Sequence, residues 1–85
     1  MWTIYVLKSE KTNKRYVGIT QDLERRLAEH NAGKSKFTSA YVPWAICYTE
    51  FANTTDEARK REKYLKSAAG RKYVDKKLSA GSLPD

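Results

Sequence analysis

One stretch of this sequence, residues 3–30, constrains the fold more than any other, because two short β-like runs in it lead directly into a helix-like segment. The runs are T-I-Y-V-L and R-Y-V-G-I, and a polar turn at residues 9–14 separates them. Aromatic and β-branched runs joined by a short polar turn are typical of a β-hairpin. Since T-Q-D-L-E-R-R-L-A-E-H follows without a linker, the sequence predicts a β-β-α unit.

The first run is apolar on both of its alternating faces, which carry Trp2, Ile4 and Val6 on one side and Thr3, Tyr5 and Leu7 on the other. Such a strand is typical of the centre of a sheet. In a hairpin Tyr5 and Tyr16 could then share one face. Gly18 lacks a side chain and permits a bulge or the close approach of another group, while Asn13 suits a left-handed turn position.

A helix is predicted over residues 21–31, with Thr20 as its N-cap and Gly33 at its end. Two leucines form its apolar stripe, and Arg26 and His30 lie together along one edge of that stripe. We therefore expect these two side chains at the boundary between core and solvent.

The rest of the chain adds one strand and two helices to this unit. Residues 45–51 read as a strand, and T-T-D-E at residues 54–57 is a capping box that starts a helix with Thr54 as N-cap and Gly70 at its end. A last helix is predicted over residues 71–78. The sequence predicts an α+β fold in the order β-β-α-β-α-α, with three helices flanking a small, mainly antiparallel three-stranded sheet. The domain is expected to span residues 1–78, and residues 79–85 to form a flexible tail.

The charge of the chain indicates a polyanionic partner. Seventeen Lys and Arg against ten Asp and Glu give a net charge of +7 in 85 residues. Residues 54–78 hold nine of these cations against four acids. Since each phosphate neutralised by Lys or Arg releases condensed counterions, nucleic acid is the favoured partner, and an ordinary basic surface is the alternative.

Cysteine usage and hydropathy exclude several classes of protein. The single Cys47 excludes an internal disulfide, and no Cys/His cluster offers a structural zinc site. Cys47 lies in an apolar run and is expected to be an inert core thiol. The apolar runs are too short to span a membrane, so a cytoplasmic location is expected.

Glu62 is the anomaly of the second helix. Helical geometry places it in the middle of an apolar stripe formed by Ala58, Leu65 and Ala69. A buried carboxylate costs free energy unless it is paired or bound to a cation. Two interpretations follow from the pattern alone: an ion pair with Arg26 or Arg59, or a functional site.

These residues together resemble the GIY-YIG endonuclease family over nearly the whole chain. T-I-Y at residues 3–5 matches its first motif and Y-V-G at residues 16–18 its second; Arg26, His30 and R-E-K-Y-L-K at residues 61–66 follow in the family's order. The chain is similar to the nuclease module of bacterial excision-repair endonucleases. Two departures are Thr3 in place of the first glycine and the lack of an asparagine after Glu62, for which Asp75 or Lys72 are candidate substitutes.

The resemblance implies Mg²⁺-dependent hydrolysis of phosphodiester bonds, with DNA favoured over RNA. Tyr5 would be the general base on the attacking water, and Tyr16 would orient the water or the phosphate. Arg26 would neutralise developing charge, His30 would assist by hydrogen bonding, and Glu62 would hold one Mg²⁺ (or Mn²⁺) per site.

A base with the ordinary tyrosine pKa of about 10 must be shifted, and nearby positive charge from Arg26, His30 and the metal is the expected cause. Four cations are weaker candidates for contacts with the nucleic-acid backbone: Lys8, Arg15, Lys34 and Lys36.

A non-catalytic nucleic-acid-binding module on the same fold is the alternative function. The combination of Tyr5, Tyr16, Arg26 and Glu62 favours the enzyme, since a simple binder has no reason to place Glu62 among basic residues. A protein-interaction adaptor leaves the charge unexplained. An unidentified targeting protein is a further candidate partner.

Overall fold

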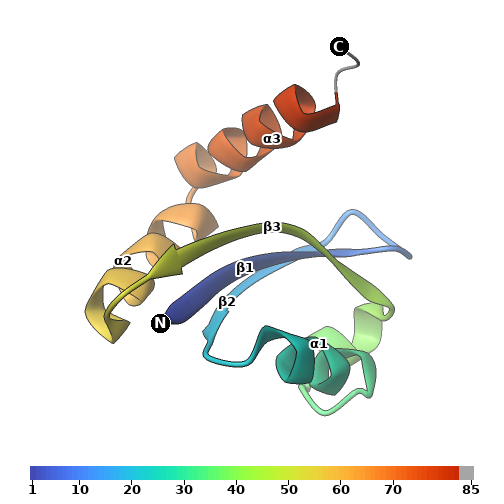
Figure 1. Ribbon diagram of the computed structural model, residues 1–85. Coiled ribbons are helices and arrows are strands. Elements are labelled where there is room, and N and C mark those ends of the chain that lie inside the picture. Colours follow the sequence, from blue (N-terminus) through green and yellow to red (C-terminus); the bar gives the residue numbers. More distant parts are fainter. Residues whose placement is uncertain (83–85) are drawn as a thin grey trace.

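The computed structural model describes residues 1–82 as a three-layered α+β fold, in which a sheet separates two groups of helices (Figure 1). The elements are β1 (Trp2–Ser9), β2 (Arg15–Thr20), α1 (Leu23–Asn31), the 3-10 helix η1 (Thr38–Tyr41), β3 (Trp44–Ala52), α2 (Thr55–Lys66) and α3 (Ala68–Ser82). The predicted order β-β-α-β-α-α is confirmed, with η1 added where the sequence predicted an irregular connection. Within residues 1–82 no helix is long and apolar enough to cross a membrane.

The sheet has the strand order β2-β1-β3, and both pairings are antiparallel. The first strand is therefore central, as its two apolar faces predicted. Tyr5 pairs with Gly18 and Leu7 pairs with Tyr16, so both tyrosines lie on the same face.

Each face of the sheet carries its own core. Ile4 and Val6 pack with Leu65 of α2 and Val74 of α3 on one face. On the other face Tyr5, Leu7 and Trp44 form a second cluster, against which Leu23 and Leu27 of α1 pack. The helices of Figure 1 follow this division, with α1 below the sheet, α3 above it and α2 beside the left end of the strands.

Two local predictions in the first half of the chain are wrong, and one is correct. The N-cap of α1 is Asp22, whose carboxylate accepts the Arg25 N–H at 3.1 Å, whereas Thr20 accepts the Asp22 N–H at 3.0 Å in the preceding turn. Asn13 is not left-handed, because no described residue other than glycine has a positive φ. Gly33 follows the end of α1 with φ +78°, as predicted.

Thr54 caps α2 as predicted, but Gly70 does not end that helix. The break is at Ser67, whose hydroxyl accepts the Gly70 N–H at 3.1 Å and so caps α3. Gly70 instead permits close packing, since a Cβ there would lie 2.0 Å from the Tyr64 carbonyl oxygen. The last helix continues to Ser82, so the first residues of the predicted tail are helical, and residues 83–85 lie outside the described residues.

Candidate active site

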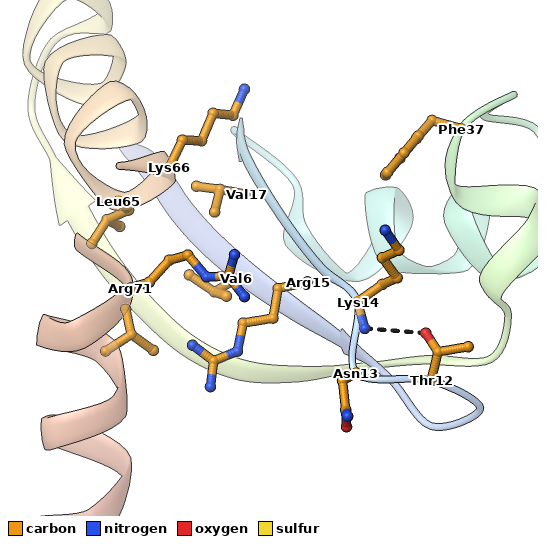
Figure 2. A pocket seen from close by; sticks show the side chains of 11 residues that line it. Val6, Thr12, Asn13, Lys14, Arg15, Val17, Phe37, Leu65, Lys66 and Arg71 are labelled. Carbon is orange, nitrogen blue, oxygen red and sulfur yellow. Dashed lines mark hydrogen bonds between the residues drawn. The ribbon is translucent and has the colours of Figure 1, made fainter. Parts of the chain in front are cut away.

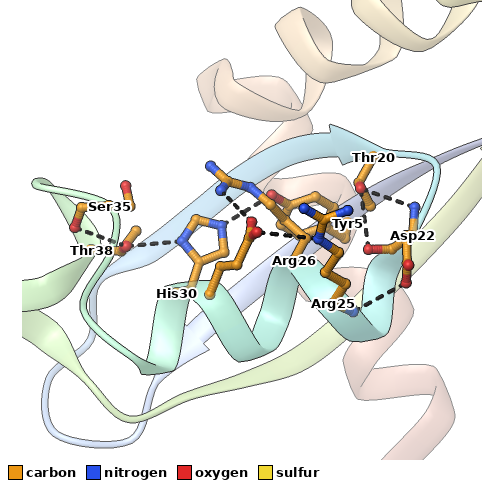
Figure 3. A network of polar contacts seen from close by, with 9 residues as sticks. Tyr5, Thr20, Asp22, Arg25, Arg26, His30, Ser35 and Thr38 are labelled. Carbon is orange, nitrogen blue, oxygen red and sulfur yellow. Dashed lines mark hydrogen bonds and ion pairs between the residues drawn. The ribbon is translucent and has the colours of Figure 1, made fainter.

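A buried chain of polar contacts joins Tyr5 on β1 to His30 on α1 (Figure 3). The Tyr5 hydroxyl lies 3.1 Å from His30 Nε2, and His30 Nδ1 lies 2.8 Å from Thr38 Oγ1. The Thr38 hydroxyl donates to the Ser35 carbonyl, which leaves its oxygen to accept the Nδ1–H. His30 Nε2 is then the acceptor of the Tyr5 O–H.

His30 is completely buried, which corrects the expectation that it lies at the boundary with solvent. The end of α1 turns inward there, because the η1 segment covers it and supplies the Thr38 hydroxyl. Burial and the charge of Arg26 lower the pKa of His30, so its imidazole is neutral at pH 7.

Gly18 positions Tyr5. A Cβ at this residue would lie 2.5 Å from the Tyr5 hydroxyl oxygen and 2.7 Å from its Cζ, well inside van der Waals contact. The Tyr5 ring therefore lies directly over the glycine of the paired strand. The β1–β2 pairing is regular here, so of the two roles predicted for Gly18 the close approach is correct and the bulge is not.

Tyr16 forms the more open side of the same site. Its ring centroid lies 4.8 Å from that of His30 and 6.2 Å from that of Tyr5. Phe37, from the loop before η1, lies 6.3 Å from Tyr16 and is 54% exposed. Phe37 and Thr38 were missed in the sequence, because nothing in a polar loop indicates which of its residues returns to a distant strand.

Arg26 reaches the site from α1, as predicted. Its Nη1 donates to Glu29 Oε1 at 3.0 Å, and its side chain is 35% exposed (Figure 3). Glu29 was missed as a partner, although its i, i+3 spacing from Arg26 was a readable signal. Interactions with Glu29 and with the Tyr5 hydroxyl raise the pKa of Arg26 and keep it charged.

The pKa of Tyr5 is raised, which contradicts the expected downward shift. Burial is the largest cause, and it outweighs the lowering by the neighbouring Arg26. His30 adds no positive charge because it is neutral. Tyr5 is accordingly a neutral hydroxyl that already has a proton acceptor, and not a preformed phenolate.

Glu62 lies on α2 with its side chain 21% exposed, so it is only partly buried. It pairs with Lys66 at 3.2 Å, and neither with Arg26 nor with Arg59. Ala69, expected on the same helical stripe, is exposed on α3. The charge of Glu62 makes a small contribution to raising the pKa of Tyr5, so the carboxylate is within electrostatic range of the tyrosine site.

Among the described residues no group of three His, Cys, Asp or Glu side chains could hold a metal ion. A metal held by Glu62 at this site would therefore have at most one further ligand of these types. That fits Mg²⁺, which binds through one or two carboxylates and keeps several waters beside a substrate phosphate. Lys66 is 55% exposed and forms an i, i+4 pair of small strength with Glu62, so a cation could displace it.

The four predicted backbone-binding cations do not surround the tyrosines. Lys8 pairs with Arg15 across the hairpin, on the face covered by α2 and α3 and opposite to Tyr5. Strand alternation already indicated this for Lys8, which has the parity of Ile4 and Val6.

Arg15 forms an ion pair with Asp75 of α3 at 2.5 Å. Asp75 is thereby paired on the opposite face of the sheet from the tyrosines, which does not fit the role of the missing asparagine. Lys34 and Lys36 are exposed in the loop that carries Phe37. Cys47 is half-buried, and burial raises the pKa of its thiol, in agreement with an inert residue.

The chain matches known proteins over most of its length. The model of the GIY-YIG catalytic domain matches residues 1–74. A UPF0213 protein of Staphylococcus haemolyticus is 38% identical over 65 residues, which are 75% of this chain and 78% of that protein. UPF0213 protein YazA of Bacillus subtilis is 36% identical over 80 residues, 89% of this chain and 80% of that protein. The solution NMR structure of a UPF0213 protein from Bacillus halodurans is similar, with a TM-score of 0.52, 27% identity and coverage of 96% of this chain and 86% of that one.

Proposed function

This chain belongs to the GIY-YIG family, and on that basis we propose that it is a Mg²⁺-dependent endonuclease that hydrolyses phosphodiester bonds of nucleic acid, DNA in preference to RNA. The observation that carries the proposal is the hydrogen bond of 3.1 Å between the Tyr5 hydroxyl and His30, with the Arg26 guanidinium beside it. A cytoplasmic location and a separate targeting protein stay predictions.

Proton transfer from the attacking water is the task of Tyr5 and His30. Because burial raises the pKa of Tyr5, a free phenolate is a costly intermediate. In the proposed step the Tyr5 oxygen accepts a proton from the water as its own proton passes to His30 Nε2. Tyr5 is neutral before and after the step, and the proton ends on the imidazole, whose Nδ1–H still donates to Thr38.

Arg26 and a metal held by Glu62 would neutralise the negative charge on the phosphate. The partly exposed guanidinium of Arg26 presents a fork of donors suited to two phosphoryl oxygens. Glu62 would hold Mg²⁺ (or Mn²⁺), and the metal when bound supplies further charge neutralisation at the phosphate. Tyr16 has the ring contacts and the exposure to orient the water or the phosphate.

Nicking of supercoiled plasmid by the purified chain, with Mg²⁺ and with EDTA, tests this proposal. We expect nicking with Mg²⁺ alone, and its loss in Glu62→Gln. Glu57→Gln is the matched control, because Glu57 is exposed on the same helix about 140° away from Glu62. Nicking that persists in EDTA or in Glu62→Gln contradicts the metal role, and no nicking by the unaltered chain contradicts the enzyme.

The second candidate function is non-catalytic binding of nucleic acid. The observation that favours it is the ion pair with Lys66, which already satisfies the Glu62 carboxylate without a metal. In that case the chain binds the plasmid, does not nick it, and binds equally well in Glu62→Gln.

A further inference from the structure

A second basic site is lined by Val17 of β2, which strand alternation places on the opposite face from Tyr16. Figure 2 shows this site. It is a cavity of about 510 Å³ between the β1–β2 hairpin and the junction of α2 with α3. Its floor is apolar, formed by Val6, Val17, Leu65 and Val74. Its cations come from three separate segments of the chain: Lys14 and Arg15, Lys66, and Arg71.

The four cations of this pocket are not fully neutralised by their neighbours. Arg15 is paired with Asp75, and Lys66 with Glu62. Lys14 and Arg71 make no ion pair with any residue in 1–82. No acidic side chain lines the cavity, so it carries an excess of positive charge over an apolar floor.

Two residues link the pocket to the tyrosine site. Phe37 lines it and lies 6.3 Å from Tyr16. Lys66 also lines it and pairs with Glu62, the candidate metal ligand. Between these residues runs β2, an edge strand of the sheet that alternates its side chains between the two sites.

We propose that this pocket, lined by Lys14, Arg15, Lys66 and Arg71, binds a second backbone phosphate of the nucleic-acid strand whose scissile phosphate lies at Tyr5 and Arg26. The inference rests on the proposed function and extends it to the path of the substrate. Forked arginine donors suit a phosphate, and the valine and leucine floor suits the sugar and base attached to it. The strand would cross the edge of β2 beside Phe37, whose exposed ring is available for stacking.

The test compares Arg71→Ala with Lys76→Ala in the full chain. Both residues are exposed on α3, about 140° apart, and Lys76 does not line the pocket. Binding of a fluorescein-labelled DNA oligonucleotide is followed by anisotropy in EDTA over a series of salt concentrations. Arg71→Ala should weaken binding several-fold and reduce the slope of log K against log salt by roughly 0.7 to 0.9, the value of one phosphate contact. Lys76→Ala should change both quantities much less.

Lys14→Ala on the opposite wall provides a second variant should Arg71→Ala fail to fold, as judged by its thermal midpoint. In NMR spectra, a thymidine dinucleotide with a 5′ phosphate should shift the methyl signals of Val17 and Val74, and not those of Val42. Equal effects of the Arg71 and Lys76 substitutions, or no shift of the pocket methyls, overturn the second site. Plasmid nicking is read separately, so failure of the enzyme and failure of this subsite give different results.

Discussion

Substitution of Gly18 by alanine tests whether the glycine is there to admit the Tyr5 side chain. The added Cβ would lie 2.5 Å from the Tyr5 hydroxyl oxygen, whereas ordinary contacts between such atoms are about 3.5 Å or longer. Tyr5 is 1% exposed and enclosed by its neighbours, so its ring cannot swing into solvent. It must shift by about 1 Å within a packed layer.

The cost of this shift has three parts. Overpacking of a core typically costs about 1–3 kcal/mol, and displacement of Tyr5 from His30 loses a hydrogen bond with a net value of about 1 kcal/mol. The lower entropy of the unfolded chain offsets about 0.4–1 kcal/mol. The free energy of unfolding should therefore fall by about 1–3 kcal/mol, which for a domain of this size lowers the thermal midpoint by roughly 5–20 °C.

A double-mutant cycle tests whether the Tyr5 hydroxyl contributes to the cost. Tyr5→Phe alone leaves His30 Nε2 buried without a partner, at a cost of about 1–3 kcal/mol, and it also removes the oxygen nearest the new Cβ. The double variant should therefore be less destabilised than the sum of the single variants, by about 1 kcal/mol or more. Urea unfolding of the four proteins measures this coupling. Additivity within about 0.5 kcal/mol would refute the argument, because Gly18 would then act only through strand propensity.

Three further predictions concern Arg26, Glu62 and His30. Arg26→Lys should nearly abolish plasmid nicking although the charge is kept, since an ammonium cannot span two phosphate oxygens. Near-normal turnover in this variant would show that Arg26 acts only as a positive charge. The exposed Arg25, substituted as Arg25→Lys, is the control. Without metal, Glu62→Ala should leave the thermal midpoint almost unchanged, because an i, i+4 pair with the exposed Lys66 is worth about 0.3–0.5 kcal/mol. A fall of several kcal/mol in the free energy of unfolding would make Glu62 a structural residue. The folded-state pKa of His30 is below its ordinary value of 6.5, so just below pH 6.5 the unfolded chain binds more protons at this residue than the folded chain does. The free energy of unfolding should therefore fall as pH drops below 6.5, with a slope of up to about 1.4 kcal/mol per pH unit that is absent in His30→Gln. Denaturant unfolding of both proteins at several pH values measures this slope. Equal slopes would contradict the lowered pKa of His30.

Local patterns in the sequence predicted the order of the strands and α-helices, and which side chains of the first strand share a face of the sheet. The two apolar faces of the first strand predicted its central place, whereas the register that pairs Tyr5 with Gly18 came only from the structure. The capping box predicted Thr54 as the N-cap of α2. These predictions hold because strand alternation and capping are decided within a few residues of chain.

Only the tertiary structure decided how the site residues are used. Helical periodicity placed His30 beside Arg26, but the η1 segment buries His30 and supplies Thr38 as its partner. Burial of Tyr5 itself reverses the expected direction of its pKa shift. Glu62 forms an ion pair with Lys66, and not with Arg26 or Arg59 as predicted. Arg15 forms an ion pair with Asp75 on α3. Periodicity fixes the direction in which a side chain points from its own element. Its depth and its partner depend on segments distant in sequence that pack over it, and these determine its solvation and its charge.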